Sequence, residues 1–422
     1  MKIEILSTGE ELLSGALADT NAAWLSEKLT QNGLQVKRHQ AVGDDLPIII
    51  KVLSEIGQRA DILIVTGGLG PTSDDLSAEA ASKAINKPLI FFQNVYDDMC
   101  AFFKRTKRPM NPSNKKQAYL PESAQVIPNP IGTASGFKVW IDQCHTFFLP
   151  GVPSEMIRMF NNYVLPELHD LLNHSDAIKT AQQTISCFGI SESLMGEKIA
   201  DIPSLINGIK VGTRSKYPEL QIKLYAVGKS FQQVETRLKQ AENLCQDRLG
   251  EYIFSINGET IQQVVGHILR KKSDSLAIAE SCTGGLIAHW ITQVPGSSNY
   301  FKCGVVTYSN ESKENILGVH SETIQTFGAV SLETVQEMAI GIRNKTNADY
   351  ALATSGIAGP DGGTDEKPVG TLCMAVACES ETYSQKIVLP FGKRSQKKEM
   401  FALAALDMLR RKLQGKNDLN YA

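Results

Sequence analysis

Short apolar runs alternate with amphipathic stretches from the first residue to about residue 170. Three runs have the length and apolar composition of buried strands: Ile3–Ser7, Leu34–Val42 and Ile62–Thr66. Helical periodicity follows them, first from about Asn21 to Leu29, and Pro153 fits the first turn of a helix at Glu155–Leu172. Because strands that alternate with helices pair in parallel, this part of the chain predicts a largely parallel sheet with helices on both faces.

Residues from about 175 to 255 carry a plainer pattern. His174, Ser175 and Asp176 form a polar break, after which Leu220–Val227 is strand-like and Glu235–Asp247 is helical. This length fits a small α+β domain or an elaborate connector. The segment contains no spacing that is typical of a catalytic site.

The alternation of strands and helices resumes near Gly258. Helices are expected at Ile261–Leu269 and Gln396–Arg411, and strands at Leu276–Ala279, Tyr350–Thr354 and Thr371–Ala377. The predicted fold class is therefore α/β. Two separate α/β sandwich domains, residues 1–172 and 257–422, are joined by a small α+β domain at residues 173–256.

Composition excludes several classes of protein. The 43 Lys and Arg residues nearly balance 45 Asp and Glu, and a net charge of −2 argues against binding nucleic acid by bulk charge. The eight cysteines form no CxxC pair and do not cluster with the seven histidines, so neither a zinc site nor a disulfide framework is expected. The first residues lack signal-peptide features and no run of about 18 apolar residues occurs, so we expect a cytoplasmic protein without membrane contact.

The first candidate for chemistry follows the strand expected at Leu276–Ala279. Glu280-Ser281-Cys282-Thr283-Gly284-Gly285 predicts a tight turn and a helix that begins at about Gly285. Ser281 would then lie beside unpaired backbone N–H groups, near Thr283 and Gly284, that can stabilise an oxyanion. The alternative is a serine that caps the helix, with glycines that serve packing.

A serine nucleophile needs a base, and no histidine is well placed. His289 lies two turns along the same helix, so a Ser-His-Asp triad is poorly supported. In Val305–Lys313 a buried strand runs into a polar turn, with Tyr308 at the strand end and Lys313 five residues later. A lysine in a dry pocket has a lowered pKa and can act as a general base, whereas most lysines after a strand are simply solvated.

Two further segments follow predicted strands. Thr354–Gly363 is rich in glycine, so its backbone around Ser355 and Gly356 can approach a ligand closely. Pro390–Arg394 leads into the last helix and offers the Arg394 guanidinium to a phosphate or carboxylate. Ligands of open α/β sheets bind beyond the carboxyl ends of strands, so we expect these segments to gather at one site.

These segments together resemble the C-terminal domain of the CinA family. The resemblance is carried by the runs AESCTGG, TYSNESK, TSGIAGPDGG with Pro368-Val369-Gly370, and FGKR. That domain is similar to nicotinamide-nucleotide amidohydrolases, which convert nicotinamide mononucleotide to nicotinate mononucleotide and ammonia with a serine–lysine arrangement. The activity needs no cofactor.

The resemblance implies a role for each matching residue. Ser281 resembles the nucleophile, Lys313 its proton acceptor, and Tyr308 the residue that assists proton transfer or orients the amide. The residues expected to bind substrate are Thr283, Gly284, Ser355, Gly356 and Arg394. Cys282 is a competing nucleophile whose pKa a helix start would lower, but no histidine is placed to pair with it, so we favour Ser281.

The first domain holds a second candidate site at Val65–Asp75, a strand followed by a glycine-rich loop and a helix start. Phosphate oxygens approach backbone N–H groups closely where side chains are small, as at Gly67, Gly68, Gly70 and Thr72. Asp74 and Asp75 would bind a divalent metal that bridges a pyrophosphate, or would cap the next helix. The spacing is not that of a Walker loop.

This loop, with Ser7–Glu11, Asn129–Gly136 and Leu149–Met156, resembles the molybdopterin-binding-like domain of CinA proteins. Members of that domain family resemble ADP-ribose pyrophosphatases, which depend on a divalent metal (Mg²⁺ or Co²⁺) and potassium. Two positions depart from the pattern: Ser77 stands where threonine is common, and Ser135 where proline is common. The middle domain resembles the KH-type linker of long CinA proteins through Phe188–Ser193, without a GxxG loop or basic face for RNA.

The resemblance thus implies a homodimeric hydrolase of pyridine-nucleotide salvage. Nicotinamide mononucleotide would be the ligand of the C-terminal domain and ADP-ribose that of the N-terminal domain. One alternative is that the N-terminal half is a molybdopterin-type binding module without hydrolysis. Another is a competence or DNA-damage factor that acts through partners.

Overall fold

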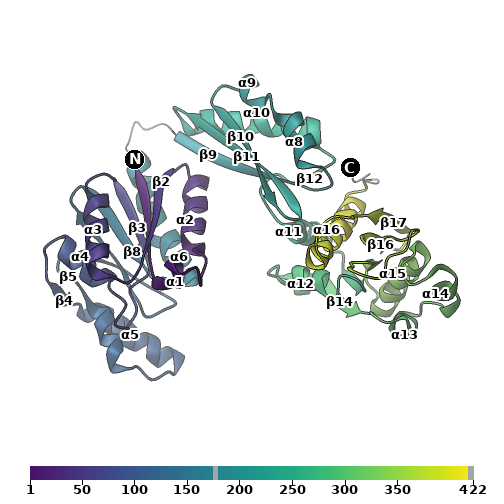
Figure 1. The fold of residues 1–422 in the computed structure, drawn as a ribbon, viewed down its shortest axis with the longest axis horizontal. Helices are drawn as coiled ribbons and strands as arrows, with labels where there is room; N and C mark the ends of the chain where they lie inside the picture. The colour runs from purple at the N-terminus through teal and green to yellow at the C-terminus, as the bar shows by residue number, and fades with distance from the viewer. Residues whose placement is uncertain (174–178, 417–422) are drawn as a thin grey trace. The chain divides into compact units, whose positions relative to one another are not determined.

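The computed structural model describes residues 1–173 and 179–416 (Figure 1). The chain divides into two compact units, Met1–Gln182 with Val227–Glu235, and Gln183–Ala226 with Thr236–Ala422. The polar break expected at His174, Ser175 and Asp176 lies outside the described residues.

The N-terminal unit is built on a six-stranded sheet of order β2-β1-β3-β8-β7-β6. Its strands are β1 (Ile3–Thr8), β2 (Val36–Val42), β3 (Ile62–Thr66), β6 (Gln125–Ile127), β7 (Gly136–Ile141) and β8 (Cys144–Leu149). The first four in that order are parallel, whereas β7 pairs antiparallel with β8, and β6 antiparallel with β7. The sheet is therefore mixed, and the expectation of a largely parallel sheet holds only for one side of it.

Alternate residues of the central strands feed two separate hydrophobic cores. Leu63 and Val65 pack in one core and Ile62 and Ile64 in the other, because successive side chains of a strand point to opposite faces. In Figure 1, α3 and α4 cover one face and α2 and α6 the other. The helical elements are α1 (Glu10–Leu13), α2 (Thr20–Gln31), α3 (Leu46–Gly57), α4 (Ser77–Ala84), α5 (Gln93–Thr106), η1 (Pro112–Ala118), α6 (Pro153–Met159), η2 (Phe160–Val164) and α7 (Leu165–Asn173).

The helix expected at Glu155–Leu172 is divided into three pieces. Pro153 begins α6, and the π-helical turn η2 separates α6 from α7. Pro166 lacks a backbone N–H and so cannot donate into the preceding turn, which accounts for the wider turn before α7. Beside the main sheet, β4 (Leu89–Phe91) and β5 (Tyr119–Pro121) form a small antiparallel pair.

The middle segment forms a four-stranded sheet of order β10-β11-β9-β12. Its elements are β9 (Lys179–Cys187), α8 (Glu192–Ile199), α9 (Ile202–Leu205), β10 (Ile209–Lys216), β11 (Glu219–Gly228), α10 (Phe231–Leu249) and β12 (Ile253–Ser255). A single sheet with helices packed on it agrees with the small α+β fold expected for this segment.

The C-terminal segment carries a five-stranded sheet of order β14-β13-β15-β16-β17. Its strands are β13 (Leu276–Glu280), β14 (Phe301–Val306), β15 (Tyr350–Gly356), β16 (Thr371–Ala377) and β17 (Thr382–Val388). β14, β13 and β15 are parallel, and β16 is antiparallel to both β15 and β17. The carboxyl ends of β13, β14, β15 and β17 therefore lie at one edge of the sheet.

Each face of this sheet packs on its own helices. Leu276 and Ile278 pack in a core with α11 and α16, whereas Ala277 and Ala279 face α15. The helical elements are α11 (Ile261–Lys272), α12 (Leu286–Thr292), η3 (Ser297–Asn299), α13 (Asn310–Ser312), η4 (Lys313–Leu317), α14 (Ser321–Phe327), α15 (Leu332–Thr346) and α16 (Arg394–Leu413). The fold class is thus α/β, as the sequence predicted for both end domains, and both of their sheets are mixed.

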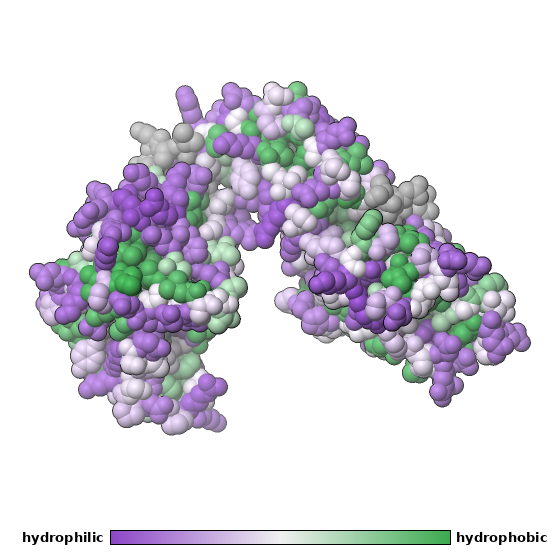
Figure 2. Space-filling view, in the orientation of Figure 1, coloured by the Kyte–Doolittle hydropathy of each residue, from purple (hydrophilic) through white to green (hydrophobic). Residues whose placement is uncertain are grey.

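The visible surface is dominated by hydrophilic side chains, with hydrophobic ones in scattered patches (Figure 2). Among the described residues, no helix combines the length and apolar character needed to cross a membrane.

Candidate active site

Ser281 lies at the carboxyl end of β13, in the turn that leads to α12. Its backbone N–H donates to the carbonyl of Thr354 at 3.0 Å, which fixes the turn against β15. The residue is 8% exposed, so its hydroxyl is enclosed without being fully sealed. The N-cap of α12 is Gly285 with no side-chain bond, so the alternative that Ser281 caps this helix is wrong.

Lys313 follows the neighbouring strand β14 and is buried, with 1% of its surface exposed. Its Nζ lies 3.2 Å from Ser281 Oγ, 2.8 Å from the Thr307 carbonyl oxygen and 3.4 Å from that of Tyr308. Burial lowers the pKa of the Lys313 amine. The contact expected between the two side chains is therefore present, and the alternative of a solvated lysine is wrong.

The contacts around the Lys313 amine suit its neutral form. A neutral amine has two N–H groups and one lone pair, and two of the neighbouring atoms are carbonyl oxygens that can only accept. In the ammonium form the third N–H donates to Ser281 Oγ. In the neutral form both N–H groups serve Thr307 and Tyr308, so the lone pair faces Ser281, which then donates its proton toward the lysine in the geometry that activates an alcohol.

Glu280, the last residue of β13, is a functional candidate that the sequence did not reveal. Its buried carboxylate accepts the backbone N–H groups of Gly285 (2.9 Å), Ile287 (3.2 Å) and Ala288 (2.9 Å). These three donors lie at the start of α12, where unpaired N–H groups were expected beside Ser281. For these three the expectation is wrong, because an acidic side chain from the strand satisfies them.

The turn itself leaves fewer oxyanion donors than expected. The Gly284 N–H, one of the two predicted donors, donates to the Ser281 carbonyl at 3.1 Å. Gly284 has a positive φ of 61° and adopts a conformation that glycine tolerates best. A Cβ at that position would lie 3.2 Å from Nζ of Lys398, so a cationic side chain from α16, also missed by the sequence analysis, lies beside the turn.

Cys282 is a poor competitor for the nucleophile. The thiol is buried, and burial raises its pKa to about 12. The lowering expected from a helix start is therefore wrong, since the loss of hydration outweighs the favourable backbone dipoles. Almost none of this thiol is ionised near neutral pH.

Thr283 and Ser355 make hydrogen bonds that stabilise the site from within. The Thr283 hydroxyl pairs with that of Thr354 at 2.9 Å, and the residue is fully buried. The Ser355 hydroxyl donates to the carbonyl of Ala329 at 2.6 Å. These contacts occupy both hydroxyls within the protein, and the binding of substrate by Thr283 and Ser355 stays a prediction. Gly356 lets neighbouring parts of the protein pack closely against its backbone, since a Cβ there would lie 3.2 Å from Cys282 Sγ.

Tyr308 and Arg394 form a pair at the rim of the same edge. The Arg394 guanidinium donates to the Tyr308 hydroxyl at 2.8 Å and to the Gly359 carbonyl at 2.6 Å. Both side chains are exposed. The guanidinium has five N–H groups, so three remain for a phosphate or carboxylate after these two bonds.

A cavity of 380 Å³ lies in the N-terminal unit. It is lined by residues at or just after the ends of four parallel strands: Thr8 and Gly9 at the end of β1, Asp44 after β2, Gly67 and Gly68 after β3, and Pro150 and Gly151 after β8. The cavity therefore occupies the position at which open α/β sheets bind ligands. Gly70, Asp74 and Asp75 of the predicted loop also line it.

The glycine-rich loop is held by a buried serine of α4. Gly67 and Gly68 have positive φ values of 104° and 66°. The Ser77 hydroxyl donates to the Gly67 carbonyl at 2.8 Å, and a Cβ at Gly68 would lie 2.4 Å from Ser77 Oγ. The serine that replaces the common threonine thus keeps the hydroxyl that orients the loop.

Asp75 closes the loop on itself. Its carboxylate accepts the Thr72 backbone N–H at 2.8 Å and the Thr72 hydroxyl, and it packs over Gly70. The predicted cap of the next helix is wrong, because the N-cap of α4 is Leu76 without a side-chain bond. Lys116 Nζ contacts the Thr72 carbonyl and brings a cation to the same loop.

Glu155 also lines the cavity and was not among the predicted site residues. Burial raises the pKa of its carboxyl, and a hydrogen bond from Asn129 at 2.7 Å partly opposes that rise. It lies near the start of α6, where acidic residues are common caps, so its sequence position gave no signal. Within the described ranges, no three His, Cys, Asp or Glu side chains are arranged to hold a metal ion.

The folds and sites define a protein of two α/β units, one with a serine–lysine pair and one with a glycine-rich cleft. Family models match in order along the chain: a probable molybdopterin binding domain (residues 4–170), the KH domain of damage-inducible protein CinA (182–255) and the CinA C-terminal domain (258–413). The chain belongs to the CinA family.

Full-length relatives carry the name CinA-like protein. That of Desulfosudis oleivorans is 46% identical over 98% of this chain and 100% of its own, and that of Shewanella sediminis is 43% identical over 98% and 96%. The crystal structure of competence damage-inducible protein A from Klebsiella pneumoniae is 36% identical, with a TM-score of 0.36, and covers 36% of this chain and 95% of its own.

Proposed function

We propose that the C-terminal segment hydrolyses the carboxamide of nicotinamide mononucleotide to give nicotinate mononucleotide and ammonia. The observation that carries the proposal is the 3.2 Å contact between Ser281 Oγ and the buried Lys313 Nζ. A hydroxyl beside an amine of lowered pKa is a nucleophile–base pair that needs neither histidine nor metal.

The first half of the reaction forms an acyl-enzyme. Ser281 Oγ attacks the carboxamide carbon while its proton passes to Lys313 Nζ, which produces a tetrahedral intermediate and an ammonium on the lysine. The C–N bond then breaks, and Lys313 gives the proton to the departing nitrogen, so ammonia leaves and the amine is neutral again.

The second half reverses these roles with water. Water attacks the acyl carbon as Lys313 accepts one of its protons, and the proton returns to Ser281 as the ester bond breaks. Glu280 takes no proton in either half, because its carboxylate is occupied by three backbone N–H groups and holds the turn in place. The Arg394–Tyr308 pair at the rim offers the charge and donors that a ribose phosphate requires.

Ammonia release from nicotinamide mononucleotide tests the proposal. We expect Ser281→Ala to lose activity by about 10³-fold or more, because Ser281 is the hydroxyl that the Lys313 amine contacts. Cys282→Ala is the matched control at the next position and should stay within a few-fold of wild type. A Ser281→Ala protein that is folded by circular dichroism and still releases ammonia at the wild-type rate would overturn the assignment. The reaction is expected to survive chelation.

We propose further that the N-terminal cleft hydrolyses ADP-ribose to AMP and ribose 5-phosphate. The cleft at the carboxyl edge of the sheet, with its small-residue loop and the half-buried Glu155 carboxyl, supports this activity. Two carboxylates, Asp74 and Asp75, fit Mg²⁺ or Co²⁺, because such an ion takes one or two protein carboxylates and completes its shell with water and substrate phosphate. The metal would supply neutralising charge to the pyrophosphate, and potassium is a proposed second ion.

Product analysis with and without divalent metal separates this activity from its alternatives. We expect AMP and ribose 5-phosphate with Mg²⁺ or Co²⁺, and none after chelation. Binding of a pterin without any hydrolysis would favour a molybdopterin-type module instead. A competence or DNA-damage role through partners predicts neither set of products, and we expect no retention of DNA at low salt. We propose a homodimer and a cytoplasmic location for the working enzyme.

A further inference from the structure

The middle and C-terminal segments belong to one compact unit and meet at two places along α16. Near the end of this helix, Arg411 donates to the Glu251 carbonyl and is held by Asp407 at 2.9 Å. Near its start, the Tyr217 hydroxyl donates to the Gln396 carbonyl at 3.0 Å. With a rise of about 1.5 Å per residue, these contacts lie about 22 Å apart along the helix. The middle segment therefore holds both ends of the helix that follows the predicted substrate-binding turn.

Tyr217 lies at the tip of a hairpin that is paired up to its turn. β10 and β11 are antiparallel as far as Lys216 and Glu219, which also form an ion pair at 2.7 Å. Tyr217 is the first of the two turn residues between them. Partial burial and the nearby charge of Glu399 raise the pKa of Tyr217, so its hydroxyl keeps its proton and remains a donor.

The turn that Tyr217 contacts carries Arg394. Residues 389–393 connect β17 to α16, and a Cβ at Gly392 would lie 3.2 Å from Gln396 Cβ and 3.5 Å from the Tyr217 hydroxyl oxygen. Gln396 Oε1 also accepts the Lys393 N–H at 2.9 Å. Tyr217 thus lies against residues on both sides of Arg394 and helps to fix the turn.

Arg394 connects this turn with the serine–lysine pair. Its guanidinium donates to the Tyr308 hydroxyl at 2.8 Å, and the Tyr308 carbonyl oxygen lies 3.4 Å from Lys313 Nζ. A guanidinium binds phosphate through a planar fork, so its affinity depends on orientation as well as on charge. A contact that fixes the turn therefore acts on the orientation of this fork.

We propose that Tyr217 is a positioning residue of the amidase, which holds Arg394 where its guanidinium meets the ribose phosphate of the substrate. The middle segment, which contains no spacing typical of a catalytic site, then contributes to substrate selection. The inference rests on the proposed hydrolysis of nicotinamide mononucleotide by the C-terminal segment.

Steady-state kinetics of ammonia release from nicotinamide mononucleotide by the full chain test the proposal. Tyr217→Phe removes only the hydroxyl and should raise KM about 2- to 10-fold while kcat stays within about twofold. In an Arg394→Met background the same change should alter KM by less than about 1.5-fold, because no guanidinium is left to position. Tyr225→Phe, at an exposed position of β11 away from the tip, is the matched control and should keep the wild-type KM.

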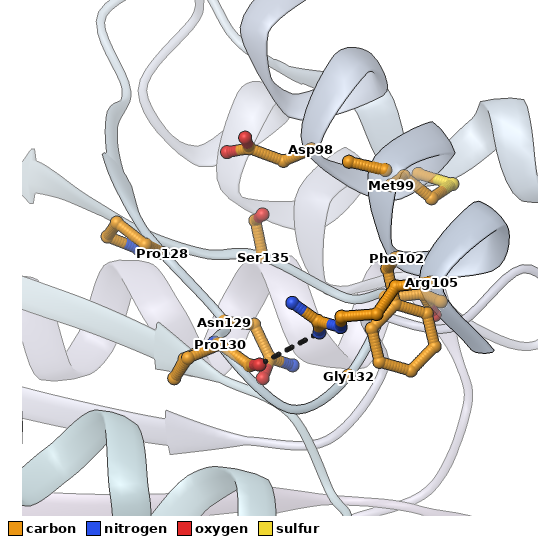
Figure 3. A pocket seen from close by; sticks show the side chains of 11 residues that line it. Asp98, Met99, Phe102, Arg105, Pro128, Asn129, Pro130, Gly132 and Ser135 are labelled. Atoms are coloured by element: carbon orange, nitrogen blue, oxygen red, sulfur yellow. Dashed lines mark hydrogen bonds between the residues drawn. The ribbon is translucent and has the colours of Figure 1, made fainter.

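Arg105→Met is the matched control for Arg394→Met. Arg105 is an exposed arginine of the N-terminal unit that lines a cavity of 230 Å³ and donates to the Pro130 carbonyl at 3.2 Å (Figure 3). Because this guanidinium belongs to the other compact unit, Tyr217→Phe should keep its full effect on KM in an Arg105→Met background.

The outcomes separate the positioning role from the amidase itself. Ammonia release with an unchanged KM in Tyr217→Phe would overturn the role of Tyr217 and leave the amidase intact. An equal rise of KM in the Arg394→Met background would also overturn it, because Tyr217 would then act without Arg394. If no ammonia is released, calorimetry with nicotinamide mononucleotide decides. Binding that Tyr217→Phe weakens only when Arg394 is present would support the positioning role and overturn the amidase, whereas binding that it leaves unchanged would overturn both.

Discussion

Glu280→Gln tests how the turn that carries Ser281 is held. The carboxylate accepts three backbone N–H groups, those of Gly285 and Ile287 on one oxygen and that of Ala288 on the other. Glutamine has nearly the same shape but only one acceptor oxygen. Its best orientation keeps the two bonds on the shared oxygen and turns an NH₂ group toward the Ala288 N–H.

The expected cost follows from that count. One bond to a charged acceptor is lost, the other two become bonds to a neutral one, and the Ala288 N–H is left unsatisfied. With about 1.5–3 kcal/mol for a charged bond and about 1 kcal/mol for a neutral one, we expect a loss of about 2.5–7 kcal/mol in the free energy of unfolding. The same change should lower kcat for ammonia release about tenfold or more, because Ser281 lies next to the altered residue.

Tryptophan fluorescence can report this loss for one unit alone. The chain has three tryptophans, and only Trp290 lies on α12. Urea unfolding in a Trp24→Phe, Trp140→Phe background therefore follows the helix that Glu280 caps. Glu322→Gln, at the start of α14 on the surface, is the matched control and should change stability by less than about 0.5 kcal/mol. A Glu280→Gln change as small as the control's would refute the reasoning.

Three further predictions concern other parts of the two sites. Lys313→Met should lower ammonia release about 10²- to 10⁴-fold. Because the base must be neutral and burial lowers the pKa of Lys313, wild-type kcat should fall as the pH drops through that pKa. On the alkaline side kcat should reach its plateau at a pH below 10.5, the ordinary pKa of a lysine. A rate independent of pH between 5 and 10 would contradict this role. Ser77→Ala should cost about 1–3 kcal/mol and raise KM for ADP-ribose, measured by urea unfolding and AMP release, since the Gly67 carbonyl loses its donor. Arg394→Lys should raise KM for nicotinamide mononucleotide several-fold at nearly constant kcat, and an unchanged KM would exclude Arg394 from binding.

Strand order explains why the serine–lysine contact could be predicted. Ser281 and Lys313 both follow short apolar runs that pattern alone marks as buried strands, and β13 and β14 are parallel neighbours. The carboxyl ends of such strands meet at one edge, so residues 32 positions apart reach each other. The glycine-rich cleft could be predicted for the same reason, because β1, β2, β3 and β8 all end at it.

Contacts that depend on how a turn folds back onto the sheet could not be predicted from strand order. Glu280 reads as the last residue of a strand, and its role appears only once α12 is placed with its first turn over that side chain. The pairing of Thr283 with Thr354 likewise needs β15 beside the turn. Glu280 and Thr283 are polar residues whose hydrogen-bond partners cannot be identified from the hydrophobic pattern.

The hydrophobic pattern did not predict the antiparallel strands of the first sheet, and the reason lies in the turn between β7 and β8. β7 and β8 are joined by Asp142 and Gln143, a two-residue hairpin turn in which Asp142 has a positive φ of 51°. Asn-Gly and Asp-Gly are the pairs that signal such turns, and Asp-Gln is a weak match. Alternation of apolar runs alone does not distinguish a hairpin from two strands of a parallel sheet.

The buried thiol of Cys282 gives the proposed amidase a chemical resilience. Nucleophilic cysteines lose function when peroxide or an electrophile modifies the thiolate. Here the thiol's pKa of about 12 and its enclosure keep it inert, while the attacking atom one residue earlier is an oxygen. Deamidation should therefore persist under oxidative stress that inactivates enzymes with a nucleophilic cysteine.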